Sequence, residues 1–265
     1  MTRPCIAASS YLNAAPLCYS FVHGEQKDSC TFLSDRAPSR CSELLSEGQA
    51  DAALIPVIEY QRLAGLKVAP GACVASLKTV RSVVLASRVP MSDIRSVALD
   101  TSSRTSAALI QIILGRFYSL TPSYRAWAPD LKQMLESNDA ALMIGDPAML
   151  IDRSALHVYD LAEEWRNHTG LPFVFAFWAI REDSKVWPGD VDFVRARHEG
   201  LAHINDTAEE YSRSLGLSRD DLVSYLTENI SYDLDDECLR GLRLYFDLAK
   251  ECGLISNVTQ IEFLE

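Results

Sequence analysis

A polar corner near the N-terminus has the sequence Ser10-Tyr11-Leu12-Asn13-Ala14-Ala15-Pro16-Leu17 and directly follows the apolar run 6–8. The apolar run predicts a buried strand, and the small and hydroxyl residues closed by Pro16 predict a loop that starts a helix. Such a corner presents backbone N–H groups, and here also the side-chain amide of Asn13. It therefore suits a small anion, although an ordinary turn capped by Asn13 would have the same sequence.

Strand-like and helix-like segments alternate from this corner to about residue 180, the pattern of an α/β protein with largely parallel sheets. The other predicted strands are the segments 31–33, 51–56, 71–76, 83–86, 96–99, 140–144 and 173–180, with one more near Tyr124. After Pro188, apolar residues recur at three- and four-residue steps, which predicts helices that pack on the core.

Two of the predicted strands are placed to carry the chain between two lobes. Crossings near residues 86 and 178 predict a discontinuous first lobe, residues 1–86 and 178–265, with the second lobe, residues 87–177, inserted into it. In such folds the ligand binds between the lobes, beyond the carboxyl ends of the strands. We therefore expect the functional site in the inter-lobe cleft.

The charge of the chain excludes one class of partner. Its 265 residues include 25 Lys and Arg against 36 Asp and Glu, a formal net charge of -11. Nucleic-acid binding draws its affinity from phosphate neutralisation, so this balance predicts no nucleic-acid partner.

No apolar run is long enough to span a bilayer and the N-terminus lacks an export signal, which predicts a cytoplasmic protein without a membrane partner. The oligomeric state stays open.

The seven cysteines are scattered and form no Cys-x-x-Cys pair, and the five histidines have no metal-ligand spacing. This pattern predicts reduced thiols and no metal site. The polar corners also supply no His–Asp pair, nucleophilic cysteine or paired carboxylates. The protein therefore either only binds its ligand or catalyses a reaction that needs little from its side chains.

A second polar corner, Asp100-Thr101-Ser102-Ser103-Arg104-Thr105-Ser106, lies between an apolar strand and the apolar helix 107–114. It combines hydroxyl donors and an arginine with the free N–H groups and positive dipole end of a helix. A single cap would need only one hydroxyl. We therefore expect this corner to bind a carboxylate or phosphate. The predicted binding residues are Ser102, Ser103, Arg104 and Thr105.

The remaining candidates have equally good structural explanations. Gly145-Asp146-Pro147 follows a predicted strand, and Pro147 suits the first helical position, so capping is an alternative to ligand binding by Gly145 and Asp146. Arg81 and Ser82 lie in a polar bend that faces either the cleft or solvent. Ser10 and Tyr11 of the first corner complete the candidate binding residues.

Five segments of the chain occur together, in this order, in one protein family. They are Ser10 to Leu17, Asp51 to Pro56, Ala98 to Ser106, Met143 to Ala148, and Glu164-Trp165 with Thr169 to Ala176. From residue 6 to about residue 181, the chain resembles the chorismate dehydratases of the futalosine route to menaquinone. The resemblance implies a two-lobed fold like the type II periplasmic binding proteins.

The resemblance also implies an activity: dehydration of chorismate to 3-[(1-carboxyvinyl)oxy]benzoate, without a metal or an organic cofactor. By motif position it implies catalytic roles for Asn13 and Ser82. Losing water aromatises the ring, so much of the driving force lies in the substrate. We hypothesise that the second corner binds one carboxylate, that Asn13 orients the substrate and the departing hydroxyl, and that the enolpyruvyl carboxylate acts as base.

Two other functions share this fold. One is a solute-binding protein for a small carboxylate, and the other is the sister enzyme of the same pathway, the 1,4-dihydroxy-6-naphthoate synthase. Fold alone does not separate them. Incubation with chorismate does, because only a dehydratase converts it to the aromatic product.

Overall fold

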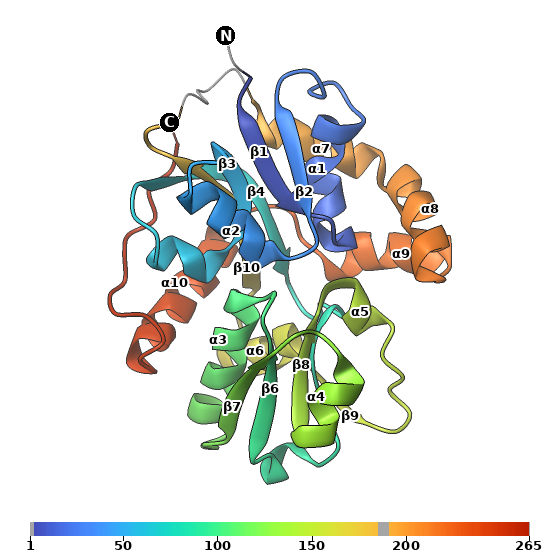
Figure 1. Ribbon diagram of the computed structural model, residues 1–265, viewed down its shortest axis with the longest axis vertical. Coiled ribbons are helices and arrows are strands. Elements are labelled where there is room, and N and C mark those ends of the chain that lie inside the picture. Colours follow the sequence, from blue (N-terminus) through green and yellow to red (C-terminus); the bar gives the residue numbers. More distant parts are fainter. Residues whose placement is uncertain (1–2, 185–190, 265) are drawn as a thin grey trace.

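The chain forms two five-stranded sheets with helices around them (Figure 1), in a computed structural model that describes residues 3–184 and 191–264. The first sheet has the order β2 (Thr31–Asp35), β1 (Cys5–Ser9), β3 (Ala52–Pro56), β10 (Phe173–Arg181), β4 (Leu66–Ser76). The second has the order β7 (Ser123–Trp127), β6 (Ser96–Asp100), β8 (Ala140–Ile144), β5 (Val83–Ser87), β9 (His157–Asp160). Each sheet is the centre of one lobe.

Both sheets are mixed, with as many antiparallel as parallel strand pairings, whereas the alternating pattern predicted largely parallel sheets. Strand β1 runs parallel to β2 and β3, and β6 runs parallel to β7 and β8. Strands β10 and β5 supply the antiparallel pairings, since each is antiparallel to both of its neighbours. These two strands are the ones that enter a sheet directly after the chain has left the other lobe.

The chain passes between the sheets at residues 77–82 and returns at residues 170–172. The crossings expected near residues 86 and 178 instead fall inside β5 and β10, and each of these strands lies wholly in one sheet. Strands buried on both faces have the same apolar sequence in either lobe, so the apolar runs do not mark the passage. The chain instead crosses in the short segments just before these strands.

The carboxylate of Asp160 stabilises the first crossing. It accepts hydrogen bonds from the N–H groups of Val80 (3.0 Å) and Arg81 (2.6 Å), and it caps the helix that follows through the N–H of Ala162 (3.0 Å). Burial raises the pKa of Asp160, and these N–H donors oppose that rise. Arg81 has a left-handed backbone, with φ of 60°. The Asp160 contact holds it in this conformation.

The helices lie on the faces and ends of the two sheets (Figure 1). The first lobe carries α1 (Ala15–Val22), α2 (Pro38–Ser46), α7 (Phe193–Ala202), α8 (Ile204–Leu215), α9 (Arg219–Ser224) and α10 (Asp236–Glu251). The second carries α3 (Arg104–Ile112), α4 (Leu131–Ser137), α5 (Gly145–Met149) and α6 (Leu161–Thr169). Short 3-10 helices are η1 (Leu12–Ala14), η2 (Val57–Gln61) and η3 (Met91–Asp93), and π-helical turns are η4 (Ile113–Phe117) and η5 (Tyr225–Asn229).

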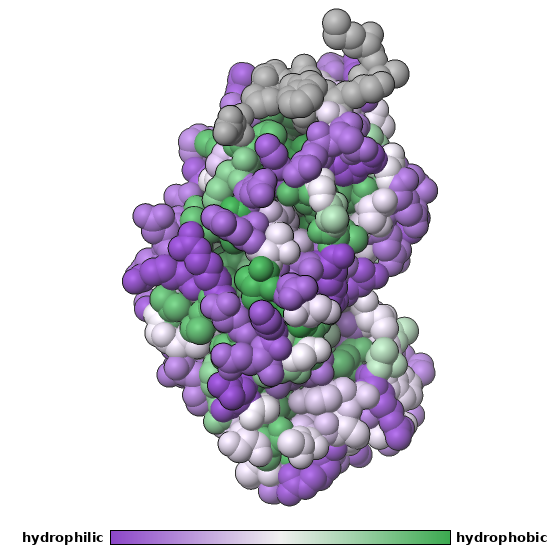
Figure 2. Space-filling model, turned by 90° about the vertical axis from the view of Figure 1, so that its left-hand side faces the viewer, coloured by the Kyte–Doolittle hydropathy of each residue, from purple (hydrophilic) through white to green (hydrophobic). Residues whose placement is uncertain are grey.

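The surface is mostly hydrophilic on the face that Figure 2 presents, where hydrophobic side chains form small areas separated by polar ones. Within residues 3–184 and 191–264, no helix has both the length and the apolar character to cross a membrane. The large apolar side chains are instead inside, among them the fully buried Trp165, Trp178 and Phe177. This burial accounts for the high hydrophobic content of the chain.

Candidate functional site

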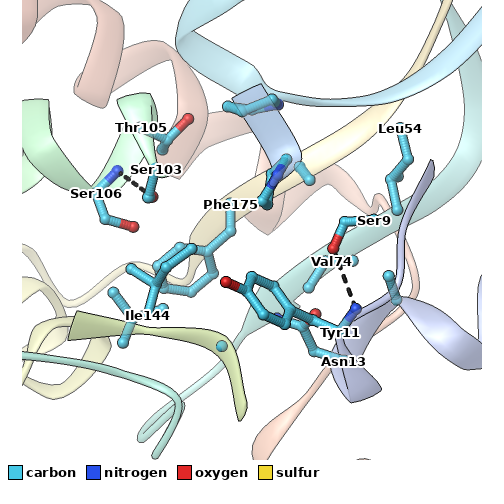
Figure 3. A pocket seen from close by; sticks show the side chains of 16 residues that line it. Ser9, Tyr11, Asn13, Leu54, Val74, Ser103, Thr105, Ser106, Ile144 and Phe175 are labelled. Carbon is cyan, nitrogen blue, oxygen red and sulfur yellow. Dashed lines mark hydrogen bonds between the residues drawn. The ribbon is translucent and has the colours of Figure 1, made fainter. Parts of the chain in front are cut away.

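A cleft between the two lobes encloses about 510 Å³, including its opening to solvent (Figure 3). Its walls are mainly apolar, formed by Leu54, Pro56, Val74, Val83, Ile144 and Phe175. Polar side chains also line it, from Ser9, Asn13, Ser103, Thr105 and Ser106. Strands β1, β3 and β8 end here at Ser9, Pro56 and Ile144, so the cleft lies at carboxyl ends of strands from both lobes.

The two predicted corners face each other across this cleft. Tyr11 of the first corner packs its ring on Gly145 of the second lobe, where an added Cβ would lie 2.6 Å from the ring. Gly145 also has φ of +65°, a left-handed conformation that disfavours other residues. Burial raises the pKa of Tyr11, and a hydrogen bond with Ser102 opposes that rise. The sequence therefore predicted both residues at the cleft, where they contact each other.

Asn13 is half-buried and lines the cleft from η1. Its side-chain amide has no hydrogen-bond partner among the described residues. The first N–H groups of a helix have no acceptor inside it, so the backbone N–H of Asn13 also lacks an intrahelical partner. Both groups are available to a ligand.

The second corner starts α3 at the opposite wall. Ser103 caps this helix, since its Oγ accepts a hydrogen bond from the N–H of Ser106 at 3.3 Å (Figure 3). The N–H groups of Arg104 and Thr105 precede the first intrahelical hydrogen bond and are directed out of the helix start. The hydroxyl of Ser106 lines the cleft and has no partner among the described residues. Ser106 was not predicted, although it belongs to the same hydroxyl run as Ser103.

Arg104 is not a cleft residue, although it was predicted to bind the substrate. Its guanidinium forms ion pairs with Glu43 (2.9 Å) and with Glu59 of the first lobe. Glu59 is only 2% exposed, and a buried carboxylate requires such pairing. Arg104 therefore joins α3 to the first lobe.

Other predicted binding residues also make contacts within the protein. The Ser102 hydroxyl donates to Asp100 at 2.5 Å. The Thr105 hydroxyl lines the cleft and accepts the N–H of Ile58 at 3.3 Å, across the lobes. The side chain of Ser10 lines a separate hollow beside α1 and α8. Ser102 and Thr105 thus help to hold the second corner in place, and Ser10 lies outside the cleft.

Ser82 is fully buried behind the cleft wall. Its hydroxyl accepts a hydrogen bond from the Tyr225 hydroxyl at 2.7 Å, and its carbonyl accepts the N–H of Gly145 at 2.7 Å. It is not among the residues that line the cleft, but its neighbour Val83 and its partner Gly145 are. Any effect of Ser82 on a ligand passes through these contacts.

Asp146 is half-buried at the start of α5. Its Oδ1 accepts a hydrogen bond from the N–H of Leu12 in the other lobe, at 3.0 Å. Burial raises the pKa of this carboxyl to about 6, and the Leu12 N–H opposes that rise. Asp146 thus contacts the corner rather than the cleft interior.

The raised pKa of Asp146 predicts a pH-dependent stability. The pKa rises from an ordinary 3.8 to about 6 on folding, so folding favours the protonated carboxyl. The resulting stabilisation is complete below a pH of about 4 and is lost as the pH rises through about 6. Asp146→Asn removes this titration. From pH 4 to pH 8 the wild type should lose unfolding free energy that the variant keeps. The difference should be on the order of 2 kcal/mol, after a discount for the partial exposure of Asp146. Urea unfolding of both proteins at pH 4 and pH 8 measures this difference. A variant that becomes less stable relative to wild type as the pH rises would contradict the prediction.

No basic or acidic side chain lines the cleft: none of its lining residues among those described is Lys, Arg, His, Asp or Glu. His, Cys, Asp and Glu side chains of the described residues also form no group of three or more that could hold a metal ion. The site therefore offers neutral donors from two corners around an apolar chamber.

Solved structures with the same architecture include periplasmic binding proteins. A protein of Archaeoglobus fulgidus superposes with a TM-score of 0.75 at 18% identity, covering 96% of this chain and 98% of that one. The alkanesulfonate-binding protein of Xanthomonas axonopodis gives 0.70 at 14% identity, covering 96% and 94%. A Candida albicans protein with the generic periplasmic binding protein fold gives 0.67 at 13% identity, covering 100% and 98%. These similarities confirm the predicted two-lobed fold.

Sequence comparison identifies closer relatives. The chain is 31% identical over 254 residues to the chorismate dehydratase of Thermus thermophilus, an alignment that covers 89% of this chain and 91% of that protein. The profile of a family described as menaquinone biosynthesis matches residues 4–251. The match spans both lobes and both corners of the cleft. The chain therefore belongs to the menaquinone biosynthesis family.

Proposed function

We propose that this chain is a chorismate dehydratase, a hydro-lyase that converts chorismate to 3-[(1-carboxyvinyl)oxy]benzoate in menaquinone biosynthesis. The observation that carries the proposal is its 31% identity, over 89% of the chain, to the chorismate dehydratase of Thermus thermophilus. The cleft is consistent with such a substrate, because an apolar chamber suits a six-membered ring and the neutral donors at both ends suit its carboxylates.

The reaction removes a ring hydrogen as a proton and the hydroxyl of the adjacent carbon, which together leave as water. The C–H electrons become the new ring double bond as the C–O bond breaks, and the ring becomes aromatic. In our proposal the substrate's own enolpyruvyl carboxylate takes the proton and passes it to the departing hydroxyl, so that water leaves and the carboxylate is regenerated. This assignment agrees with a cleft whose lining residues, among those described, include no carboxylate or imidazole.

Asn13 is the proposed catalytic residue. Its amide lines the cleft without a protein partner among the described residues, so it can donate to the departing hydroxyl and orient the ring. The hydroxyls of Ser103 and Ser106 and the N–H groups that start α3 would hold one carboxylate from the opposite wall. Apolar walls keep the closed cleft dry and strengthen these hydrogen bonds.

Ser82 stays in the proposal with an indirect role. Its hydroxyl is engaged by Tyr225, and its carbonyl fixes Gly145, on which the Tyr11 ring packs. We infer that Ser82 supports catalysis by setting the position of this wall.

All seven cysteines are free thiols, which suits a reducing compartment, so we also infer a cytoplasmic location.

Incubation of the purified full chain with chorismate tests the function. We expect an aromatic absorbance to appear and the substrate to lose the mass of one water, with no added metal or cofactor. Binding of chorismate without conversion would favour the solute-binding alternative, whose fold the alkanesulfonate-binding protein shares. Neither binding nor conversion would favour the sister enzyme, the 1,4-dihydroxy-6-naphthoate synthase.

A further inference from the structure

The helix η1, which carries Asn13, is capped from the opposite lobe. Its first N–H, that of Leu12, donates to Asp146 Oδ1 at 3.0 Å. The residue before the helix, Tyr11, provides no side-chain cap. We propose that Asp146 is a positioning residue that caps η1 across the cleft, so that closure of the lobes orders Asn13 for catalysis. This inference rests on the proposed function for the role of Asn13.

Three acceptors of the first lobe at this corner are already engaged by other donors. The Ser9 hydroxyl accepts the N–H of Tyr11 at 3.2 Å, and the Tyr11 carbonyl accepts the N–H of Ala14 at 3.0 Å. The Ser10 carbonyl accepts the Tyr211 hydroxyl at 2.9 Å. The partner of the Leu12 N–H comes from outside its own lobe, and losing it is costly because an unpaired N–H at a buried helix start is unfavourable.

The second lobe holds Asp146 in place for this contact. Gly145, the preceding residue, donates its N–H to the Ser82 carbonyl at 2.7 Å and packs against the Tyr11 ring. Asp146 does not cap its own helix, since α5 has no side-chain cap. Burial raises the pKa values of Tyr211 and Tyr225, and the charge of Asp146 adds to the rise, but their hydroxyls are hydrogen-bonded to Ser10 and Ser82 instead. Among the described residues, Leu12 is the hydrogen-bond partner of this carboxylate.

The Leu12–Asp146 contact links closure of the lobes to the ordering of Asn13. When the lobes separate, the Leu12 N–H loses its acceptor and η1, only three residues long, loses its cap. A helix this short has little stability of its own. Asn13, its middle residue, then loses its fixed orientation toward the cleft. The contact thus confines an ordered Asn13 to the closed state, where the substrate is enclosed.

Three variants test the cap. Asp146→Ala removes the acceptor, and Asp146→Asn keeps an oxygen in its place. Asp130→Ala is the matched control, because Asp130 caps α4 within the second lobe, on the N–H of Gln133 at 3.1 Å, away from the cleft. Amide hydrogen exchange at Leu12 and the kcat and KM for chorismate are measured for each.

We expect Asp146→Ala to speed exchange of the Leu12 amide about tenfold, the loss of one cap. We expect it to lower kcat by about 10-fold to 100-fold, with a smaller change in KM, because a misplaced catalytic group costs this much. Asp146→Asn should restore both values to within about threefold of wild type, since its amide oxygen still accepts. Asp130→Ala should change neither.

A double variant, Asn13→Ala with Asp146→Ala, shows whether Asp146 acts through Asn13. If it does, the double variant is no slower than Asn13→Ala alone, because effects of coupled residues do not add. Multiplied losses would overturn the inference, and so would unchanged Leu12 exchange in Asp146→Ala. Failure of the wild type to convert chorismate would refute the proposed function instead, and the exchange measurements would still decide whether Asp146 caps η1. If Asp146→Ala does not fold, normal Leu12 exchange and kcat in Asp146→Asn sustain the cap, and their loss overturns it.

Discussion

Replacing Asn13 with alanine is expected to reduce kcat for chorismate dehydration by about 10²- to 10³-fold, the cost of losing one preorganised donor. Asn13 lines the cleft with a side-chain amide that has no protein partner among the described residues. Truncating it should therefore cost the fold little, because no described hydrogen bond depends on it. The loss should fall on the step in which the hydroxyl departs, so kcat should change more than KM.

The matched control is Asn257→Ala, which removes the same amide from an exposed position in the C-terminal segment. Thermal unfolding and circular dichroism should be unchanged for both variants, while only Asn13→Ala loses turnover. Near-normal kcat in folded Asn13→Ala would refute the catalytic assignment. A large rise in KM with unchanged kcat would make Asn13 a binding residue only.

Replacing Gly200 with alanine is expected to cause the largest loss of stability. Gly200 lies in α7, where an added Cβ would be 1.7 Å from the carbonyl oxygen of Pro16 in α1. A backbone oxygen cannot rotate aside as a side chain does, so the two helices must separate. Overpacking of this kind costs about 3 kcal/mol or more. The free energy of unfolding in urea measures the loss.

Gly115→Ala is the control for this substitution. Gly115 lies in the helical turn η4, and an added Cβ there meets no atom within 4 Å. Alanine favours helix over glycine, so this variant should be unchanged or more stable by up to about 1 kcal/mol. A Gly200→Ala protein as stable as wild type would mean that α1 and α7 pack less closely than described.

The alternation of strands and helices was enough to predict the class of fold, because periodicity and turn residues are local properties. The positions of the crossings were not predictable this way. Val83–Ser87 and Phe173–Arg181 are apolar strands in either lobe, and only pairing with distant strands assigns them to a sheet. Register and pairing depend on contacts far apart in the sequence.

The residues of the candidate site also differ in how far local sequence predicts their place. Asn13, Ser103 and Thr105 line the cleft because they lie at the starts of helices that follow strands, a local arrangement visible in the sequence. Arg104 and Ser82 do not line it, for a non-local reason. The partners that draw them away are Glu59, 45 residues earlier, and Tyr225, 143 residues later. No spacing rule reveals such partners.

The absence of charged side chains from the described lining of the cleft affects how fast a substrate arrives. Enzymes that bind anions often use arginine and lysine to attract them from a distance, which accelerates encounter. This chain carries a net charge of -11, so a dianion approaches against repulsion and is attracted only by hydrogen-bond donors at contact range. Added salt screens that repulsion. Capture should therefore be slow at low ionic strength and become faster as salt is added, the reverse of the usual behaviour of anion-binding enzymes.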